Sequence, residues 1–132
     1  MNRAKRVIIL DDENLAATSN ADILCEAGYD VVGVALEAEA ALAQARASPP
    51  DLAVLDINLK AERDGIDAAL ALREICNPAI LFVSGQLDAS TRTRVAALPW
   101  AGFLLKPFWP ESLIRAARDA LARHAALNRN GQ

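Results

Sequence analysis

Four short apolar runs in this sequence each lead into a side chain that can bind a cation or an anion. Asp11 and Asp12 follow the first run, Asp56 ends the second, Ser84 follows the third and Lys106 follows the fourth. In an open parallel sheet, ligands bind beyond the carboxyl ends of the strands. If the runs are neighbouring strands, we expect these five side chains to converge at one edge of the sheet.

Such a convergence would bring together the groups that phosphoryl transfer needs. Carboxylates held close together raise one another's pKa unless a cation compensates, and oxygen ligands beside open positions suit Mg²⁺ better than Zn²⁺. Lys106 can hold a phosphoryl group as a point charge, and Ser84 can donate a hydrogen bond to the same group. Because this chemistry is mainly positioning and charge neutralisation, we expect Asp56 to be the nucleophile and to form an aspartyl phosphate.

Each of these residues also has a simpler structural explanation. An aspartate at the end of a strand often begins a turn, and the acids of residues 11–13 suit the start of a helix. Ser84-Gly85 is a common turn pair, and Lys106-Pro107 can be an ordinary strand exit. The prediction therefore depends on all four features falling at strand ends in separate segments.

The segments between these residues alternate between strand and helix patterns. We expect strands at about residues 6–11, 29–35, 52–56, 79–83 and 101–105, with a helix after each, which is typical of an α/β domain with a parallel sheet. Gly28 suits the end of the first helix, Asp88 suits the cap of the fourth, and Pro110 suits the start of the fifth. The fifth helix should bury one stripe and fray after about Arg123; the stripe consists of Leu113, Ala117, Ala120 and Leu121.

The composition fits one globular domain and excludes several classes of protein. The chain has 132 residues, 53% of them apolar and 23% charged, with a net charge of −3. It lacks the basic surface of a direct nucleic-acid binder, a secretory signal and an apolar run that could span a membrane. Cys25 and Cys76 have no metal-type spacing, so we expect free, buried thiols and a cytoplasmic location.

Together the four motifs resemble the receiver domain of two-component response regulators. The acidic pair Asp11-Asp12, Asp56 within Leu-Asp-Ile-Asn-Leu, Ser84 within Val-Ser-Gly and Lys106 within Lys-Pro-Phe all match the family pattern. The resemblance covers about residues 5–124. It implies a flavodoxin-like receiver fold, in which a five-stranded parallel sheet of order 2-1-3-4-5 carries five helices on its two faces.

The resemblance also implies roles for individual residues. Mg²⁺ would be held by the side chains of Asp12 and Asp56 and by the backbone carbonyl of Asn58, with Asp11 acting through water. A histidine kinase or a histidine phosphotransfer protein would donate the phosphoryl group to Asp56. Asn58 and Gln86 would tune the lifetime of the aspartyl phosphate.

In the family, phosphorylation changes a distant surface. Ser84 and the aromatic Phe103 would move inward, and the face of the fourth helix, fifth strand and fifth helix would bind an output partner that the sequence does not identify. The same face is a candidate homodimer interface, with Arg92, Arg94 and Asp119 as candidate contacts. The Lys106–Pro107 peptide bond is commonly cis in the family.

Four further expectations concern single features. Trp109, in place of a capping residue before the last helix, is expected to pack locally, and His124 is expected to be a packed or edge histidine. The charged loop of residues 59–65 is expected to be solvated. We expect residues 1–132 to form one receiver with a core of about 5–124 and a flexible tail at 125–132; because the sequence opens with Met and closes in a polar tail, we expect a stand-alone receiver.

The main alternative is a Mg²⁺-dependent phosphatase of the haloacid-dehalogenase type. Such an enzyme needs a second carboxylate two residues after the nucleophile, where this chain has Asn58, so we expect a phosphoacceptor and not a turnover enzyme. A flavodoxin-like nucleotide binder would need a glycine- or hydroxyl-rich loop after the first strand. A receiver used only as a scaffold and a fragment of a longer regulator are the remaining alternatives.

Overall fold

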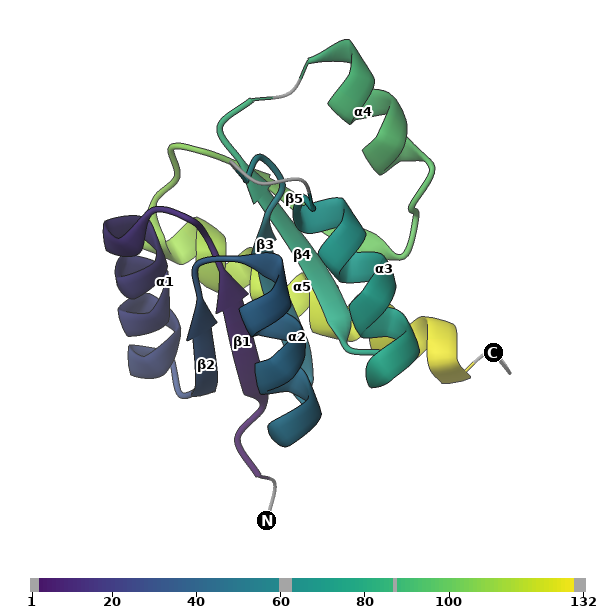
Figure 1. The fold of residues 1–132 in the computed structure, drawn as a ribbon. Helices are drawn as coiled ribbons and strands as arrows, with labels where there is room; N and C mark the ends of the chain where they lie inside the picture. The colour runs from purple at the N-terminus through teal and green to yellow at the C-terminus, as the bar shows by residue number, and fades with distance from the viewer. Residues whose placement is uncertain (1–2, 60–62, 87, 130–132) are drawn as a thin grey trace.

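A computed structural model describes residues 3–59, 63–86 and 88–129, which form strands and helices in strict alternation (Figure 1). In chain order the elements are β1 (Arg6–Leu10), α1 (Asn14–Glu26), β2 (Asp30–Ala35), α2 (Ala38–Ala47), β3 (Leu52–Asp56), α3 (Gly65–Ile75), β4 (Ala79–Ser84), α4 (Ala89–Ala96), β5 (Ala101–Leu105) and α5 (Pro110–Arg129). All neighbouring strands are parallel, in the order β2-β1-β3-β4-β5. The expected fold class is confirmed.

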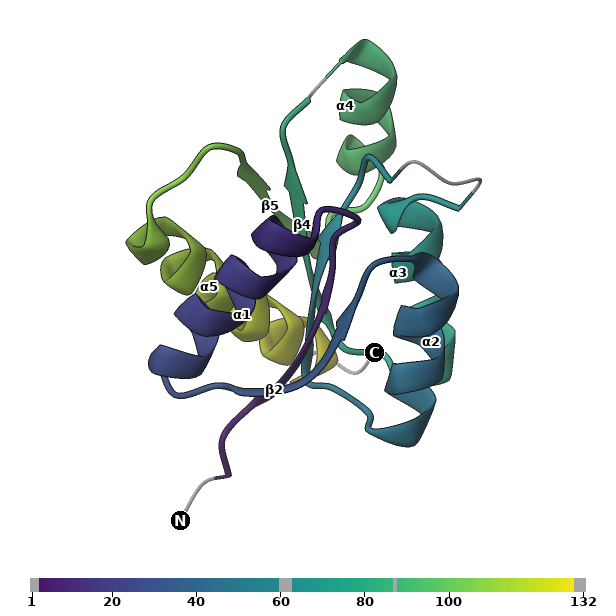
Figure 2. The same cartoon turned by 60° about the vertical axis from the view of Figure 1, so that its left-hand side comes forward.

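Helices cover both faces of the sheet, and each face has its own apolar layer. Figure 2 shows α1 and α5 on one face and α2 and α3 on the other. Because successive side chains of a strand point to opposite faces, Ile8 and Leu10 pack beneath α2 and α3, whereas Val7 and Ile9 pack beneath α1 and α5. This two-sided burial explains why the central strands are continuous apolar runs in the sequence.

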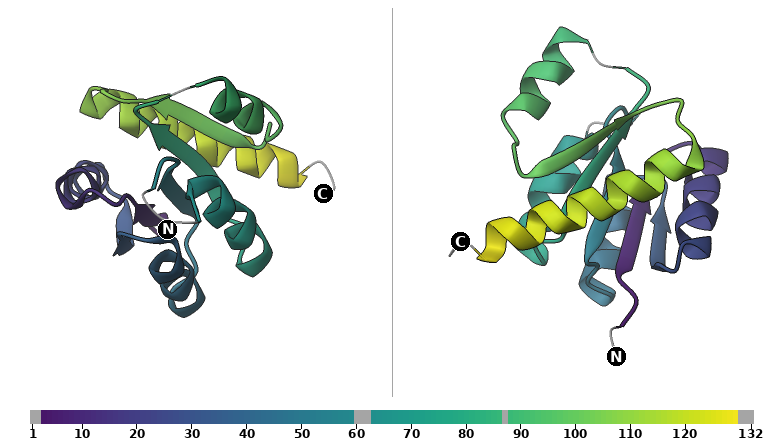
Figure 3. Two further views of the ribbon diagram at one scale, coloured as in Figure 1. Left: turned by 45° about the horizontal axis from the view of Figure 1, so that its top comes forward. Right: turned by 180° about the vertical axis from the view of Figure 1, so that it is seen from behind.

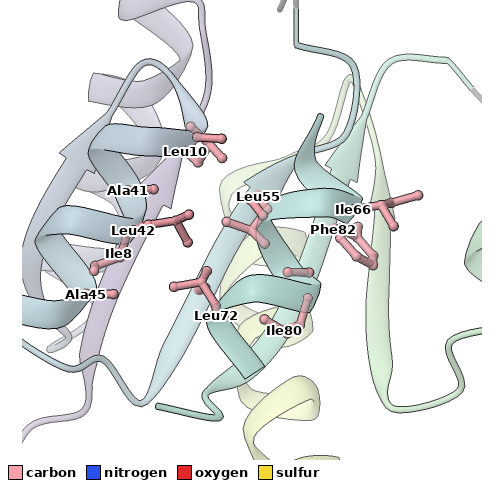
Figure 4. Close-up of a cluster of buried hydrophobic side chains, with 14 of the residues drawn as sticks. Ile8, Leu10, Ala41, Leu42, Ala45, Leu55, Ile66, Leu72, Ile80 and Phe82 are labelled. Carbon is pink, nitrogen blue, oxygen red and sulfur yellow. The ribbon is translucent and has the colours of Figure 1, made fainter. Parts of the chain in front are cut away.

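The layer under α2 and α3 fixes the strands that carry the site (Figure 4). Leu55 and Phe82 of the neighbouring strands β3 and β4 are completely buried and pack with Leu72 of α3. Burial of a side chain of this size stabilises the fold by about 1.5–3 kcal/mol. The ends of β3 and β4 are therefore anchored one residue before Asp56 and two residues before Ser84.

Several predicted ends of elements are confirmed. Gly28, after α1, has a φ of 101°, a conformation that favours glycine. The Asp88 side chain accepts a hydrogen bond of 2.8 Å from the Thr91 backbone N–H and so caps α4. Leu113, Ala117 and Ala120 of α5 are buried as expected, whereas Leu121 is only partly buried. The Lys106–Pro107 peptide bond is cis.

Three expectations about side chains and helix ends are wrong. Cys25 is exposed and Cys76 is only partly buried, although both are free thiols; the buried residues of α1 are Ala17, Asn20 and Leu24. Trp109 is 77% exposed, because it precedes the apolar stripe that begins at Leu113. α5 continues to Arg129, since an Ala- and Leu-rich stretch sustains the helix.

α4 differs from the other helices in its packing. It lies beyond the β4–β5 end of the sheet, farther from the strands than α2 or α3 (Figure 3). Of its residues only Thr91 is buried. Within the described part of the chain, no helix is both long enough and apolar enough to cross a membrane.

Candidate functional site

The acidic residues lie at the topological switch point of the sheet, where the connections that leave β1 and β3 run toward opposite edges of the sheet. β1 lies between β2 and β3, and β3 lies between β1 and β4. Asp11 directly follows β1, and Asp56 is the last residue of β3. The crevice beyond the carboxyl ends of such strands is where open α/β sheets bind ligands. The topology thus puts both residues at the most favourable place for a site.

Three carboxylates meet there. Oxygen atoms of Asp11, Asp12 and Asp56 all lie within 4.8 Å of one another. Asp11 and Asp56 are 2% and 7% exposed, and Asp12 is partly buried. The neighbouring Glu13 is exposed, and its backbone N–H donates to Asp11 Oδ1 at 2.9 Å. The predicted acidic cluster is present, and Glu13 is outside it.

Lys106 reaches the same cluster from the end of β5. Its Nζ lies 3.0 Å from Asp11 Oδ2 and 3.3 Å from Asp56 Oδ2. Burial alone would lower the pKa of Lys106, but the hydrogen bond with Asp11 and the charge of Asp56 outweigh burial and raise this pKa above the ordinary lysine value. Lys106 is therefore a firmly charged ammonium group that bridges two carboxylates.

The environment of Asp56 disfavours its charge. Burial raises the pKa of Asp56 above the ordinary carboxyl value; the Lys106 charge opposes this shift, and the Asp11 charge adds to it. Asp56 Oδ1 also accepts a hydrogen bond of 3.1 Å from the Asn58 backbone N–H. The oxygen-only ligand set of Asp11, Asp12 and Asp56 fits a hard divalent cation such as Mg²⁺.

Ser84 is completely buried next to the cluster and makes three hydrogen bonds. Its Oγ donates to the Gln86 carbonyl at 2.7 Å and accepts from the Asn58 side-chain amide at 2.8 Å and from the Gln86 backbone N–H at 3.1 Å. The two positions expected to tune the phosphoryl lifetime thus both contact Ser84. Phe103 is partly buried and packs against the layer under α2 and α3.

The start of α3 packs directly against the backbone of the site. A Cβ atom on Gly65 would lie only 2.1 Å from the Asp56 carbonyl oxygen, and the Gly65 N–H donates to the Ile57 carbonyl at 3.0 Å. The preceding Asp64 caps α3 in a reciprocal capping box with Asp67. The contact between Gly65 and Asp56 was not anticipated from the sequence. The start of α3 does have a signal in the sequence, because an acid placed three residues before a second acid, ahead of an apolar stretch, is typical of a helix start.

The loop of residues 59–65 was expected to be solvated, and this is wrong for its described residues: Leu59 packs against the apolar core, Gly65 is buried, and Arg63 and Asp64 form ion pairs. Arg63 pairs with Glu39 of α2, and Asp64 pairs with Arg94 of α4 at 2.6 Å. Residues 60–62 of the loop lie outside the described part of the chain. Arg94, a candidate dimer contact, is engaged within the molecule. His124 is partly buried on α5 near Asn128, as expected for an edge histidine.

Comparison with known families agrees with this geometry. The family model of the response regulator receiver domain matches residues 7–118. The chain belongs to the response regulator receiver family. Receiver domains are signalling switches that interact with histidine kinases or phosphotransfer proteins and with output domains, and they generally bind Mg²⁺ at an acidic pocket. In this receiver domain Asp11, Asp12 and Asp56 form a cluster of carboxylates.

Individual relatives show the same likeness. The receiver is 36% identical over 121 residues to the transcriptional regulatory protein PdtaR of Mycobacterium tuberculosis, covering 90% of this chain and 58% of that protein. It is 31% identical to the chemotaxis protein CheY of Thermotoga maritima, covering 85% and 93%. The receiver domain of a modulated diguanylate cyclase from Desulfovibrio desulfuricans superimposes with a TM-score of 0.84 at 33% identity, over 93% of this chain and 98% of that one. The chain thus spans little more than half of PdtaR and nearly all of CheY.

Proposed function

We propose that this protein is a phosphorylation switch in which Asp56 accepts a phosphoryl group from a histidine kinase or a histidine phosphotransfer protein, with Mg²⁺ in the acidic pocket. The observation that carries the proposal is the position of Asp56 between a lysine ammonium 3.3 Å away and two further carboxylates within 4.8 Å. Asp12 and Asp56 would hold the metal together with the Asn58 carbonyl, and Asp11 would act through water.

In the proposed transfer, a carboxylate oxygen of Asp56 forms a bond to phosphorus. The bond between phosphorus and the donor's histidine nitrogen breaks, and its electron pair stays on that nitrogen. Bound Mg²⁺ supplies charge neutralisation for the phosphoryl oxygens. Lys106 lies beside Asp56 Oδ2 and would exchange this contact for one with the phosphoryl group, which is a stronger acceptor. Ser84 would break its bond to the Gln86 carbonyl and donate to the same group.

The role proposed for Asn58 follows from its side-chain bond to Ser84, whereas the role proposed for the Gln86 side chain rests on the family resemblance, because Gln86 bonds to Ser84 through its backbone. The Asn58 side-chain amide holds the Ser84 hydroxyl at 2.8 Å, and Gln86 holds it through its backbone. Replacement of either side chain should alter how the phosphoryl group is shielded from water and so change its lifetime. Timing of dephosphorylation in Asn58→Ala and Gln86→Ala tests this, and decay at the wild-type rate in both would refute it.

Labelling with a small phosphodonor tests the proposal as a whole. Incubation with Mg²⁺ and acetyl phosphate, followed by intact-mass measurement, should show one added phosphoryl group. The label should be absent in Asp56→Asn and after chelation of Mg²⁺, and reduced in Asp12→Asn. Glu13→Gln is the matched control, because Glu13 is an exposed acid outside the cluster and its loss should leave labelling unchanged. No label in wild type under these conditions would contradict the proposal.

A Mg²⁺-dependent phosphatase is the alternative that the same pocket would permit. The position two residues after Asp56 is Asn58, whose side-chain amide donates to Ser84 and cannot act as a general acid. We therefore propose a stoichiometric acceptor. Sustained turnover of a small phosphate ester by wild type and its loss in Asp56→Asn would favour the phosphatase.

The remaining parts of the proposal concern binding partners and cellular location. The output would be carried by the face of α4, β5 and α5, with Phe103 as the aromatic that changes position, and the same face would serve in a homodimer. Direct nucleic-acid binding is not part of the proposal, because the net charge is −3. Two free cysteines fit a cytoplasmic protein.

A further inference from the structure

α4 is held to the rest of the molecule by little apolar packing. Thr91 is its single buried residue, and the partly buried Val95, with Leu98 just beyond the helix, supplies its apolar contact with the core. The other helices each lie along the sheet with two or more buried residues, whereas α4 stands away from it (Figure 1). The position of α4 must therefore depend strongly on its polar contacts.

A two-pronged ion pair joins α4 to the start of α3. Arg94 places Nη1 at 2.6 Å and Nη2 at 3.3 Å from the two carboxylate oxygens of Asp64, and Nη2 lies 4.0 Å from Asp67. This is the two-pronged geometry in which arginine binds a carboxylate best. The hydrogen bond with Arg94 helps to hold the pKa of Asp64 below the ordinary carboxyl value, against the effect of burial.

A second cationic contact joins α3 to the segment that follows α4. The Arg73 guanidinium lies 4.0 Å from the centre of the Trp100 ring. Arg73 is in the last turn of α3, and Asp64 immediately precedes its first turn. The two ends of α3 thus hold the α4 segment on either side, one through an ion pair and the other through a cation–π contact.

Asp64 is also coupled to the site through its neighbour Gly65. It is bonded to Gly65, which touches the Asp56 carbonyl so tightly that no side chain fits between them. A shift of the Asp56–Ile57 backbone must therefore move the start of α3 and, with it, the carboxylate that holds Arg94. Asp56 is thus linked to α4 by a continuous series of contacts, through Gly65 and Asp64 to Arg94.

We propose that the Asp64–Arg94 ion pair is a latch that keeps α4 against α3 and favours the unphosphorylated position of α4. Breaking the latch should loosen α4 before any phosphorylation occurs. It should also strengthen binding of a phosphoryl group at Asp56, because coupling between two equilibria is reciprocal. This second consequence rests on the function proposed above, whereas the first does not.

Hydrogen exchange of the α4 amides in the unphosphorylated protein tests the latch directly. Arg94→Gln and Asp64→Asn should each speed exchange in α4 by about two- to fivefold, as expected for an ion pair of this exposure. The double variant should match the single variants, because all three lose the same interaction. Asparagine still caps α3, so α3 amides should stay protected in Asp64→Asn. Arg46→Gln, which removes an arginine from the last turn of α2, is the control and should exchange as wild type.

The second readout is the affinity for beryllium trifluoride, which mimics a phosphoryl group on a carboxylate. With Mg²⁺ present, Arg94→Gln should bind it about two- to fivefold more tightly than wild type does. Unchanged α4 exchange in Arg94→Gln, or additive effects in the double variant, would overturn the latch. Faster exchange with unchanged affinity would overturn its coupling to the site. Failure of wild type to bind the probe would count against the proposed function, and the latch would then be judged by exchange alone.

Discussion

Replacement of Gly65 by alanine should damage both the fold and the site, although alanine is the better helix former. A methyl group at this position would lie 2.1 Å from the Asp56 carbonyl oxygen, 2.8 Å from its carbonyl carbon and 2.9 Å from Ile57 Cα. Ordinary contacts begin at 3.4 Å. All three neighbours are backbone atoms of a buried strand end, so α3 or β3 must move by roughly 1 Å.

The expected cost follows from these contacts. Overpacking in a core costs about 1–3 kcal/mol, and here the upper end applies because no side chain can rotate away. The gain from replacing glycine in a helix is at most about 1 kcal/mol. We therefore expect a net loss of about 2 kcal/mol in the free energy of unfolding, which for a chain of this length lowers Tm by roughly 6–10 °C.

Gly85 provides the matched control on the opposite side of the same pocket. A methyl group there meets only Lys106 Cβ at 4.0 Å, which is an ordinary contact. Gly85→Ala should change the free energy of unfolding by less than about 0.5 kcal/mol. Urea unfolding and thermal melting of both variants measure the difference, and phosphodonor labelling of Gly65→Ala should be weaker than that of wild type. A Gly65→Ala protein as stable as wild type would refute the claim that α3 starts in backbone contact with Asp56.

Three further predictions concern charge. Mg²⁺ at about a hundred times its dissociation constant should stabilise the fold by about 2.7 kcal/mol. Thermal melting with and without a chelator should show this gain in wild type and in Glu13→Gln but not in Asp12→Asn. An equal gain in Asp12→Asn would contradict the metal site. The pKa of Asp56 is raised in the folded protein, so ionisation of Asp56 lowers the free energy of unfolding as the pH rises through and above the ordinary carboxyl value. Without Mg²⁺, Asp56→Asn should therefore have a higher Tm than wild type at pH 7. A lower Tm would refute this. The pKa of Asp64 is lowered in the folded protein, so the Asp64 carboxylate stabilises the fold above the ordinary pKa of 3.8, and this stabilisation is lost as the pH falls below that value. Asp64→Asn should therefore be less stable than wild type at pH 7 by about 0.2–1 kcal/mol, and the difference should disappear in acid unfolding. A difference that does not depend on pH would contradict this.

The sequence predicted the strands and their ends well for a physical reason. Strands β1, β3 and β4 are buried on both faces, so nearly every residue in them is apolar and the first polar residue marks the edge of the sheet. Once the order of strands was given by the family resemblance, the meeting of Asp11, Asp56 and Lys106 followed. These are properties of a periodic backbone and need no knowledge of side-chain packing.

The features that the sequence did not predict depend on contacts between distant segments. Asp64 and Arg94 are 30 residues apart, and each alone has the look of an ordinary surface charge. The exposure of Trp109 and Cys25 depends on where an apolar stripe begins or ends against its neighbours. The close contact of Gly65 with Asp56 is equally invisible, because a glycine before an apolar stretch usually only marks a turn.

The most direct test of the account is to identify the carboxylate that becomes phosphorylated. After treatment with Mg²⁺ and acetyl phosphate, reduction with borohydride converts a phosphorylated aspartate to homoserine, and peptide sequencing by mass spectrometry locates it. We predict homoserine at position 56 and none at Asp11 or Asp12. Homoserine at either of those residues, or at no residue in a protein that takes up the phosphoryl group, would contradict the assignment of Asp56 as the nucleophile.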